Sequence, residues 1–216
     1  MEYRADIADT IEGAENALYI AARSGYVDNV WALLEEYERE DVDINIKEAD
    51  GWTALYNAAP CGCRELITMI LEVKGIDLRK QTKSGETSLY RACRYGNVIA
   101  VSLLLAQAEN FGYNFIDIAN NDGWTPLHTA CAQGENETVR VLLENAAEAD
   151  RKDKIEQTPL HVTNGEDRGK TVAFLLLIPK GGTVIDVTDT DKHTALHVGA
   201  ERDNSDTVKV LINGRA

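Results

Sequence analysis

Residues 122–130 read DGWTPLHTA and place the hydroxyl of Thr125 three positions before the imidazole of His128. A hydroxyl beside a histidine is also the smallest arrangement of a nucleophile and its general base. A catalytic pair is needed only once in a chain, whereas an architectural pair recurs with the architecture. The number of copies therefore decides how this stretch is interpreted.

The motif Thr-x-Leu followed by His or Tyr recurs along the whole chain. The copies are TALY (53–56), TSLY (87–90), TPLH (125–128), TPLH (158–161) and TALH (194–197), with a weaker NALY at 16–19. Their leucines are spaced by 33 residues (Leu127 to Leu160) up to 38 residues (Leu89 to Leu127). A small residue, a glycine and an apolar block typical of a helix follow most copies in the same register.

This pattern resembles the ankyrin repeat, in which a turn precedes a short helix opening with T-P-L-H, a glycine turn and a longer helix ending in Leu-Leu. The resemblance implies an all-α ankyrin-repeat solenoid of stacked helix-turn-helix units joined by hairpin-like turns, each burying its apolar sides against its neighbours. We expect one domain over 1–216. Its predicted parts are a helical cap at 1–11 and repeats at about 12–47, 48–81, 82–119, 120–152, 153–188 and 189–216.

Within each predicted repeat, three residue types have a local role. The motif threonines stand where a helix N-cap hydroxyl is wanted, and Pro126 and Pro159 fall in the first helical turn. Glycines at 51, 85 and 123 occupy a tight turn that favours positive φ. The resemblance implies that His128, His161 and His197 tie the turn to the helix and to the next repeat. Tyrosine replaces histidine in the first three copies.

Composition narrows the classes of function. The net charge of −14 repels a phosphate backbone, so we expect no nucleic-acid binding, and it suits either a basic protein partner or a well-solvated surface. No apolar run approaches the ~18 residues that suggest a membrane span, and the N-terminus lacks the pattern of a secretory signal. We therefore predict an intracellular protein, cytoplasmic or nuclear, without membrane attachment.

No motif indicates catalysis, a cofactor or a metal. Cys61 and Cys63 have no second pair at zinc spacing. The run Gly169-Lys170-Thr171 lacks the earlier glycine of a phosphate loop, since Asn164 stands there. We predict a non-enzymatic chain with no catalytic, cofactor-binding or metal-binding residues.

The resemblance implies a protein partner on the concave face, which the turn tips and first helices form. Residues just before the motif threonines and at the ends of the first helices are therefore candidates, especially Trp, Tyr and Arg. The predicted partner-binding residues are Arg23, Trp52, Glu86, Arg94, Tyr95, Trp124, Gln133, His193 and Arg202. Trp52 and Trp124 share one register, and the sequence leaves open whether they contact a partner or pack along their turns.

Two spacings exceed the usual repeat length. We expect the extra residues, around 37–43 and within 106–115, to lie after the second helix, before the next turn. The second segment contains FGYNF (111–115), whose rings either cover the longer loop or form an exposed anchor.

The last apolar block, VKVLI (208–212), is followed by no polar capping helix. This favours a chain that belongs to a longer protein, or an end that something covers, and it leaves the oligomeric state open. The alternative function is accordingly a partner- or substrate-recruiting ankyrin domain within a larger multidomain enzyme or signalling scaffold.

Overall fold

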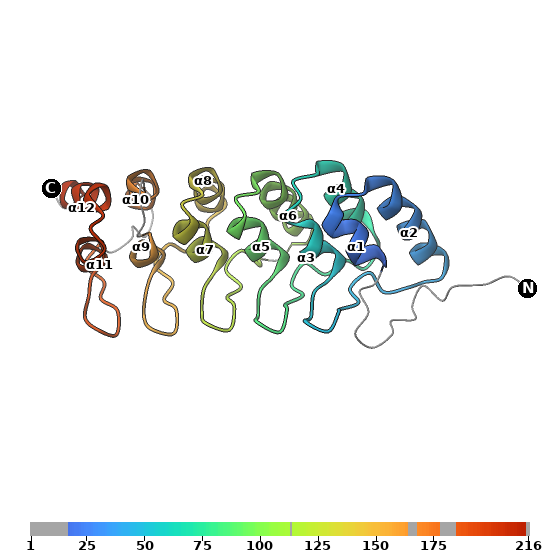
Figure 1. Ribbon diagram of the computed structural model, residues 1–216, viewed down its shortest axis with the longest axis horizontal. Coiled ribbons are helices and arrows are strands. Elements are labelled where there is room, and N and C mark those ends of the chain that lie inside the picture. The colour runs from blue at the N-terminus through green and yellow to red at the C-terminus, as the bar shows by residue number, and fades with distance from the viewer. Residues whose placement is uncertain (1–16, 113, 164–167, 178–184, 215–216) are drawn as a thin grey trace, which may run out of the picture.

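The computed structural model describes residues 17–112, 114–163, 168–177 and 185–214. Over these residues the chain forms an elongated stack of helix pairs, with one helix of each pair beside long loops that all point the same way (Figure 1). We call these loops the fingers. The described residues contain no strand, only an isolated bridge between Thr188 and Thr194.

The helices alternate between two rows. The first helices, nearer the fingers, are α1 (Ala17–Ser24), α3 (Ala54–Ala58), α5 (Ser88–Arg94), α7 (Pro126–Gln133), α9 (Pro159–Val162) and α11 (Ala195–Glu201). The second helices are α2 (Val27–Arg39), α4 (Arg64–Glu72), α6 (Val98–Phe111), α8 (Asn136–Glu144), α10 (Gly169–Leu176) and α12 (Ser205–Asn213). Each predicted repeat contains one pair, although the repeat bounds themselves stay a prediction, and the cap expected at 1–11 lies outside the described residues.

The first helices begin as the sequence predicts. The N-cap threonines are Thr53, Thr87, Thr125, Thr158 and Thr194. The Thr125 hydroxyl, for example, accepts a 3.3 Å hydrogen bond from the backbone N–H of His128. Pro126 and Pro159 are the first helical residues, where a missing N–H costs nothing.

Glycine at the finger tips has the expected left-handed backbone. Gly51, Gly85 and Gly123 have φ of 82°, 82° and 86°, and an added Cβ on Gly123 would lie 2.9 Å from the Asp153 Cα of the next finger. In the last two repeats Glu156 and Lys192 adopt the same conformation at φ of 60° and 65°. These two positions are strained because a Cβ disfavours positive φ.

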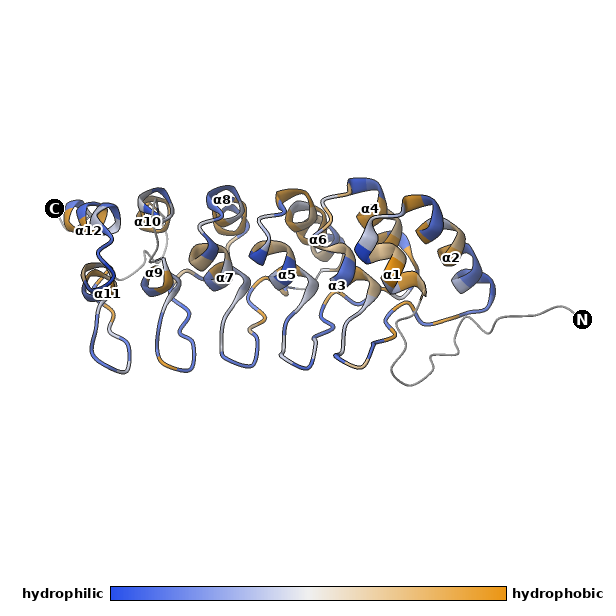
Figure 2. Cartoon of the chain, in the orientation of Figure 1, coloured by the Kyte–Doolittle hydropathy of each residue, from blue (hydrophilic) through white to orange (hydrophobic). Residues whose placement is uncertain are grey.

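Hydrophobic residues from both rows form one continuous core. The motif leucines Leu18, Leu55, Leu89, Leu127 and Leu160 are each at most 2% exposed. Hydrophilic residues concentrate along the fingers, and the helices carry both kinds (Figure 2). Each repeat therefore depends on its neighbours for burial, as expected for a solenoid.

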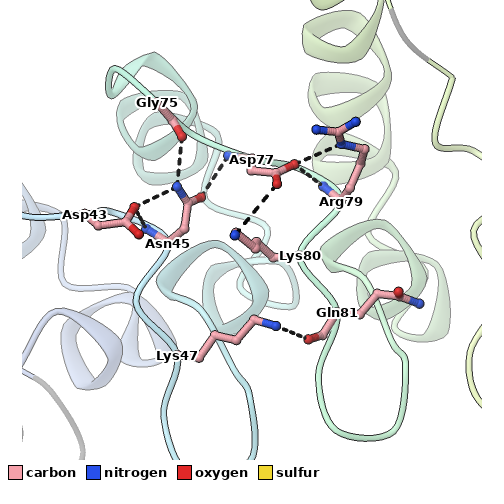
Figure 3. Close-up of polar contacts among 8 residues, drawn as sticks. All are labelled: Asp43, Asn45, Lys47, Gly75, Asp77, Arg79, Lys80 and Gln81. Carbon is pink, nitrogen blue, oxygen red and sulfur yellow. Dashed lines mark hydrogen bonds and ion pairs between the residues drawn. The ribbon is translucent and has the colours of Figure 1, made fainter.

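Polar bridges join successive repeats at the base of the fingers. The Asn45 amide donates to the Gly75 carbonyl at 2.8 Å and accepts from the Asp77 N–H at 2.8 Å, while Asp43 accepts from Asn45 (Figure 3). Lys47 reaches the Gln81 carbonyl at 2.7 Å in the same junction. One side chain thus satisfies backbone groups of the next repeat that would otherwise lack partners.

The expectation that the extra residues follow the second helices was wrong in part. They lengthen the helices instead, because α2 and α6 have 13 and 14 residues where α4 and α8 have 9. Tyr37 and Ala108 continue the buried stripe of their helices, at 1% and 5% exposure, and this burial stabilises the additional turn.

The described rings of the FGYNF segment are divided between the core and the surface. Phe115 is buried in the core at 1% exposure, whereas Phe111, at the end of α6, is 43% exposed. Tyr113 lies outside the described residues.

Candidate partner-binding surface

Side chains from the second and third repeats meet on the side of the stack that carries the fingers and first helices. Arg91 of α5 lies with its guanidinium carbon 4.8 Å from the centroid of the Trp52 ring and 4.3 Å from that of Tyr56. The two rings lie 5.7 Å apart. A guanidinium at this range from an aromatic face is held by a cation–π interaction.

Glu86 lies between Tyr56 and Arg94 and interacts with both. Its carboxylate accepts a hydrogen bond from the Tyr56 hydroxyl and lies 3.7 Å from an Arg94 guanidinium nitrogen. Burial, and then the hydrogen bond to Glu86, raise the pKa of Tyr56, so the phenol stays a neutral donor. Only 14% of the Glu86 side chain is exposed, compared with 53% for Arg94. We call Trp52, Tyr56, Glu86, Arg91 and Arg94 the Trp52 cluster.

Arg91 is the member that sequence reasoning missed. It also donates a long hydrogen bond of 3.5 Å to the Asn57 side chain on α3. A signal was present, because Arg91 stands two positions after a motif leucine. The equivalent residues of the other repeats carry no charge; they are Ile20, Asn57, Thr129, Val162 and Val198.

Trp124 has different surroundings although it shares the register of Trp52. Its indole N–H donates a 2.9 Å hydrogen bond to the Asp153 carboxylate of the next finger, and its ring lies 6.1 Å from that of His128. Trp52 donates no hydrogen bond from its indole to any described residue. The structure therefore does not join the two tryptophans into one cluster.

The other predicted residues are spread along the stack. Tyr95 caps α5 beside Arg94 and is 58% exposed. Gln133 and Arg202 are exposed at the ends of α7 and α11, and Arg23 is exposed near the end of α1. His193 is half-buried and stacks on His197 at 5.9 Å. Of the predicted set, the Trp52 cluster brings together Trp52, Glu86 and Arg94.

The Thr125–His128 pair has an architectural arrangement. Nδ1 of His128 lies 2.9 Å from the Thr125 hydroxyl, and Nε2 lies 3.1 Å from the Gln157 carbonyl of the next repeat. His161 repeats the arrangement with Thr158 and the His193 carbonyl, at 2.8 and 3.2 Å. Burial lowers the pKa of His128 to about 4. Both ring nitrogens are occupied, so the imidazole holds two repeats together.

Comparison with known proteins agrees with this geometry. A family model described as ankyrin repeats in three copies matches residues 2–82 and 67–153. The chain belongs to the ankyrin-repeat family. The crystal structure of the human ASB11 ankyrin repeat domain superposes with a TM-score of 0.74 at 25% identity, and the match covers 94% of this chain and 85% of that one.

Two curated ankyrin-repeat relatives are much longer proteins. The chain is 29% identical over 169 residues to the Caenorhabditis elegans homolog of transient receptor potential cation channel subfamily A member 1. It is also 29% identical over 149 residues to the Mus musculus B-cell lymphoma 3 protein homolog. The matches cover 78% and 68% of this chain but only 13% and 32% of those relatives.

Ankyrin repeats generally serve as protein–protein interaction modules, and the fold is typically non-enzymatic. Among the residues that the structure describes, no group of three or more His, Cys, Asp or Glu side chains is placed to hold a metal ion. In the same residues, no helix has the length and apolar character needed to cross a bilayer.

Proposed function

We propose that this chain is a non-enzymatic interaction module that binds a protein partner on the concave face, centred on the Trp52 cluster. The observation that carries the proposal is the placement of Arg91 against Trp52 and Tyr56 on the finger side. Tryptophan, tyrosine and arginine are the residue types most enriched where truncation costs the most binding energy. Because contacts with neighbouring repeats already hold these side chains, binding would order them at little further entropic cost.

Exposed residues extend the surface along α5. Arg94 and Tyr95 reach into solvent, and Arg94 can pair with a carboxylate of the partner without leaving Glu86.

The overall charge of −14 favours a partner that is basic elsewhere on its surface. Gln133, His193, Arg202 and Arg23 remain predicted contacts further along the row of first helices, whereas the hydrogen bond from Trp124 to Asp153 favours a structural role for that residue. The absence of nucleic-acid binding and a location in the cytoplasm or nucleus also stay predictions.

A second candidate is a recruiting domain within a larger enzyme or signalling scaffold. The observation that favours it is that the matched curated relatives are several times longer than the region this chain matches. The same surface would then deliver a substrate or partner to another domain of the same polypeptide. Sequencing the full-length transcript distinguishes the two, since an additional catalytic or signalling domain supports recruitment and its absence supports an independent module.

Partner capture with matched variants tests the binding surface. Wild type, Trp52→Ala/Arg94→Ala and the control Arg140→Ala, which changes a partly exposed residue of α8, are immobilised in equal folded amounts. We expect a specific protein to be retained by wild type and control and lost by the double variant. Retention of the same proteins by all three, or of none by wild type, would remove support for this surface.

A further inference from the structure

A groove lies between α2 and α4 in the row of second helices. Its volume is about 200 Å³, and we call it the Trp31 groove. It is lined by Trp31, Leu34, Glu35, Glu38, Met69, Glu72 and Val73. Figure 1 shows α2 and α4 in the row away from the fingers, so this groove and the Trp52 cluster are on different sides of the stack.

Trp31 is a large aromatic residue that lies mostly on the surface of the solenoid. Its side chain is 55% exposed, although the valine before it is completely buried. The same register of the other second helices carries small or charged residues, namely Thr68, Ser102, Arg140, Ala173 and Lys209. Only the first repeat presents a large aromatic ring here, and a solvent-exposed indole on a groove wall is a feature typical of interaction sites.

The rim of the groove is acidic. Glu35 and Glu38 follow Trp31 by four and seven positions and therefore share its helix face, and Glu72 approaches from α4. None of these three carboxylates forms an ion pair within the described part of the chain.

Nearby cations do not neutralise this rim. Arg39, at the end of α2, pairs with Glu36 and Glu40 instead. Lys74, two residues after Glu72, is exposed and forms no ion pair with a described residue, so its single charge offsets at most one of the three carboxylates. The local charge therefore remains negative.

The floor of the groove is apolar. Leu34 is 7% exposed, Val73 is 8% exposed, and Met69 packs against the core while facing the groove. Methionine adapts its shape to different apolar side chains. The groove therefore offers an apolar floor, an aromatic wall and three carboxylates within one small volume.

We propose that the Trp31 groove is a second docking surface, which binds a basic segment of another protein. A lysine or arginine of that segment lies over the indole of Trp31 between Glu35, Glu38 and Glu72, and a neighbouring apolar side chain contacts the floor. A cation gains from both the ring face and the carboxylates, and the stem of lysine or arginine covers apolar surface. Charge complementarity selects a basic over an acidic occupant.

The test uses a fluorescent peptide that alternates lysine and leucine, with a glutamate–leucine peptide as the opposite-charge probe. Binding is followed by anisotropy at physiological ionic strength for wild type, Trp31→Ala and the triple variant Glu35→Gln/Glu38→Gln/Glu72→Gln. We expect each variant to weaken binding of the lysine peptide by about tenfold or more. The glutamate peptide is expected not to bind any of them.

A second triple variant controls for net charge. Glu137→Gln/Glu148→Gln/Glu156→Gln removes the same number of carboxylates from exposed positions on later repeats. It is expected to bind like wild type. An equal loss in both triple variants would show unspecific charge attraction and overturn the proposal. So would failure of wild type to bind the lysine peptide, or unchanged binding of that peptide by Trp31→Ala. These outcomes leave the function proposed for the Trp52 cluster untouched.

Discussion

The indole N–H of Trp124 donates a 2.9 Å hydrogen bond to the carboxylate of Asp153 in the following finger. Trp52 occupies the same register two repeats earlier, but in the finger that follows it the position equivalent to Asp153 is Thr82. Its ring is stacked by Arg91 instead. Equal positions in the repeat thus support two roles, a structural tie for Trp124 and a candidate contact for Trp52.

This difference predicts unequal effects on stability. Trp124→Phe removes the donor to Asp153, which is only 8% exposed, and we expect a loss of about 1–2 kcal/mol in the free energy of unfolding. Trp52→Phe keeps a ring beneath Arg91 and should change the free energy of unfolding by less than about 0.5 kcal/mol. Urea unfolding of both variants measures the difference. Equal losses would show that Trp52 is also a packing residue.

Protonation of His128 is expected to destabilise the fold in acid. Burial lowers the pKa of His128 from 6.5 to about 4, so between these values the unfolded chain binds the proton and the folded chain does not. Stability therefore falls as the pH drops through this window, by about 3 kcal/mol at most for this residue. Urea unfolding at several pH values between 4 and 6.5 measures the slope.

The variant His128→Gln isolates this contribution from titrating carboxylates. Glutamine cannot take up the proton, so the variant should lose less stability than wild type over the same pH range, whatever its stability at neutral pH. Burial lowers the pKa of His161 as well, which leaves a smaller residual dependence of the same sign. If the free energy of unfolding depended on pH equally in wild type and variant, the acid destabilisation could not be assigned to His128.

Two substitutions at the finger tips are expected to change the free energy of unfolding in opposite directions. Lys192→Gly relieves a non-glycine residue at φ of 65° and should raise the free energy of unfolding by up to about 1 kcal/mol. Gly123→Ala should lower it by more than about 1 kcal/mol, because the new Cβ meets the backbone of Asp153 and Lys154 at 2.9 Å. Thermal and urea midpoints provide the measurement, and a stabilising Gly123→Ala would show that the turn relaxes freely.

The Asn45 bridge predicts a local effect. Asn45→Ala removes hydrogen bonds of 2.8 Å to Gly75 and Asp77 and should weaken the junction between the first two repeats by about 1–2 kcal/mol. Amide hydrogen exchange should then quicken in α1 and α2 more than in α7 and α8, because solenoid stability is transmitted between neighbours. Uniform quickening along the chain would contradict a local role.

Sequence reasoning was sufficient for the fold because each structural position recurs. Thr125, Pro126, Gly123 and His128 have roles set by backbone geometry within one repeat or between two adjacent repeats, and the same residue types return at the same spacing. The lengths of α2 and α6 escaped this reasoning, since the added residues have no counterpart in the other repeats.

The candidate surface was only partly predictable. Trp52, Glu86 and Arg94 could be chosen by register and residue type, but their grouping depends on Arg91 and Tyr56, which come from different repeats. A contact between non-equivalent residues of neighbouring units has no periodic signal. The separate role of Trp124 likewise depends on Asp153, a residue of another finger.

The most direct test of the account is the dissociation constant of the captured partner, measured by titration calorimetry for wild type, Trp52→Ala and Trp124→Ala. We predict that Trp52→Ala weakens binding by about tenfold or more without loss of the fold, whereas Trp124→Ala lowers stability and leaves the affinity of the folded protein within about threefold. Unchanged affinity for Trp52→Ala, or a larger loss for Trp124→Ala, would contradict the assignment of the partner to the Trp52 cluster.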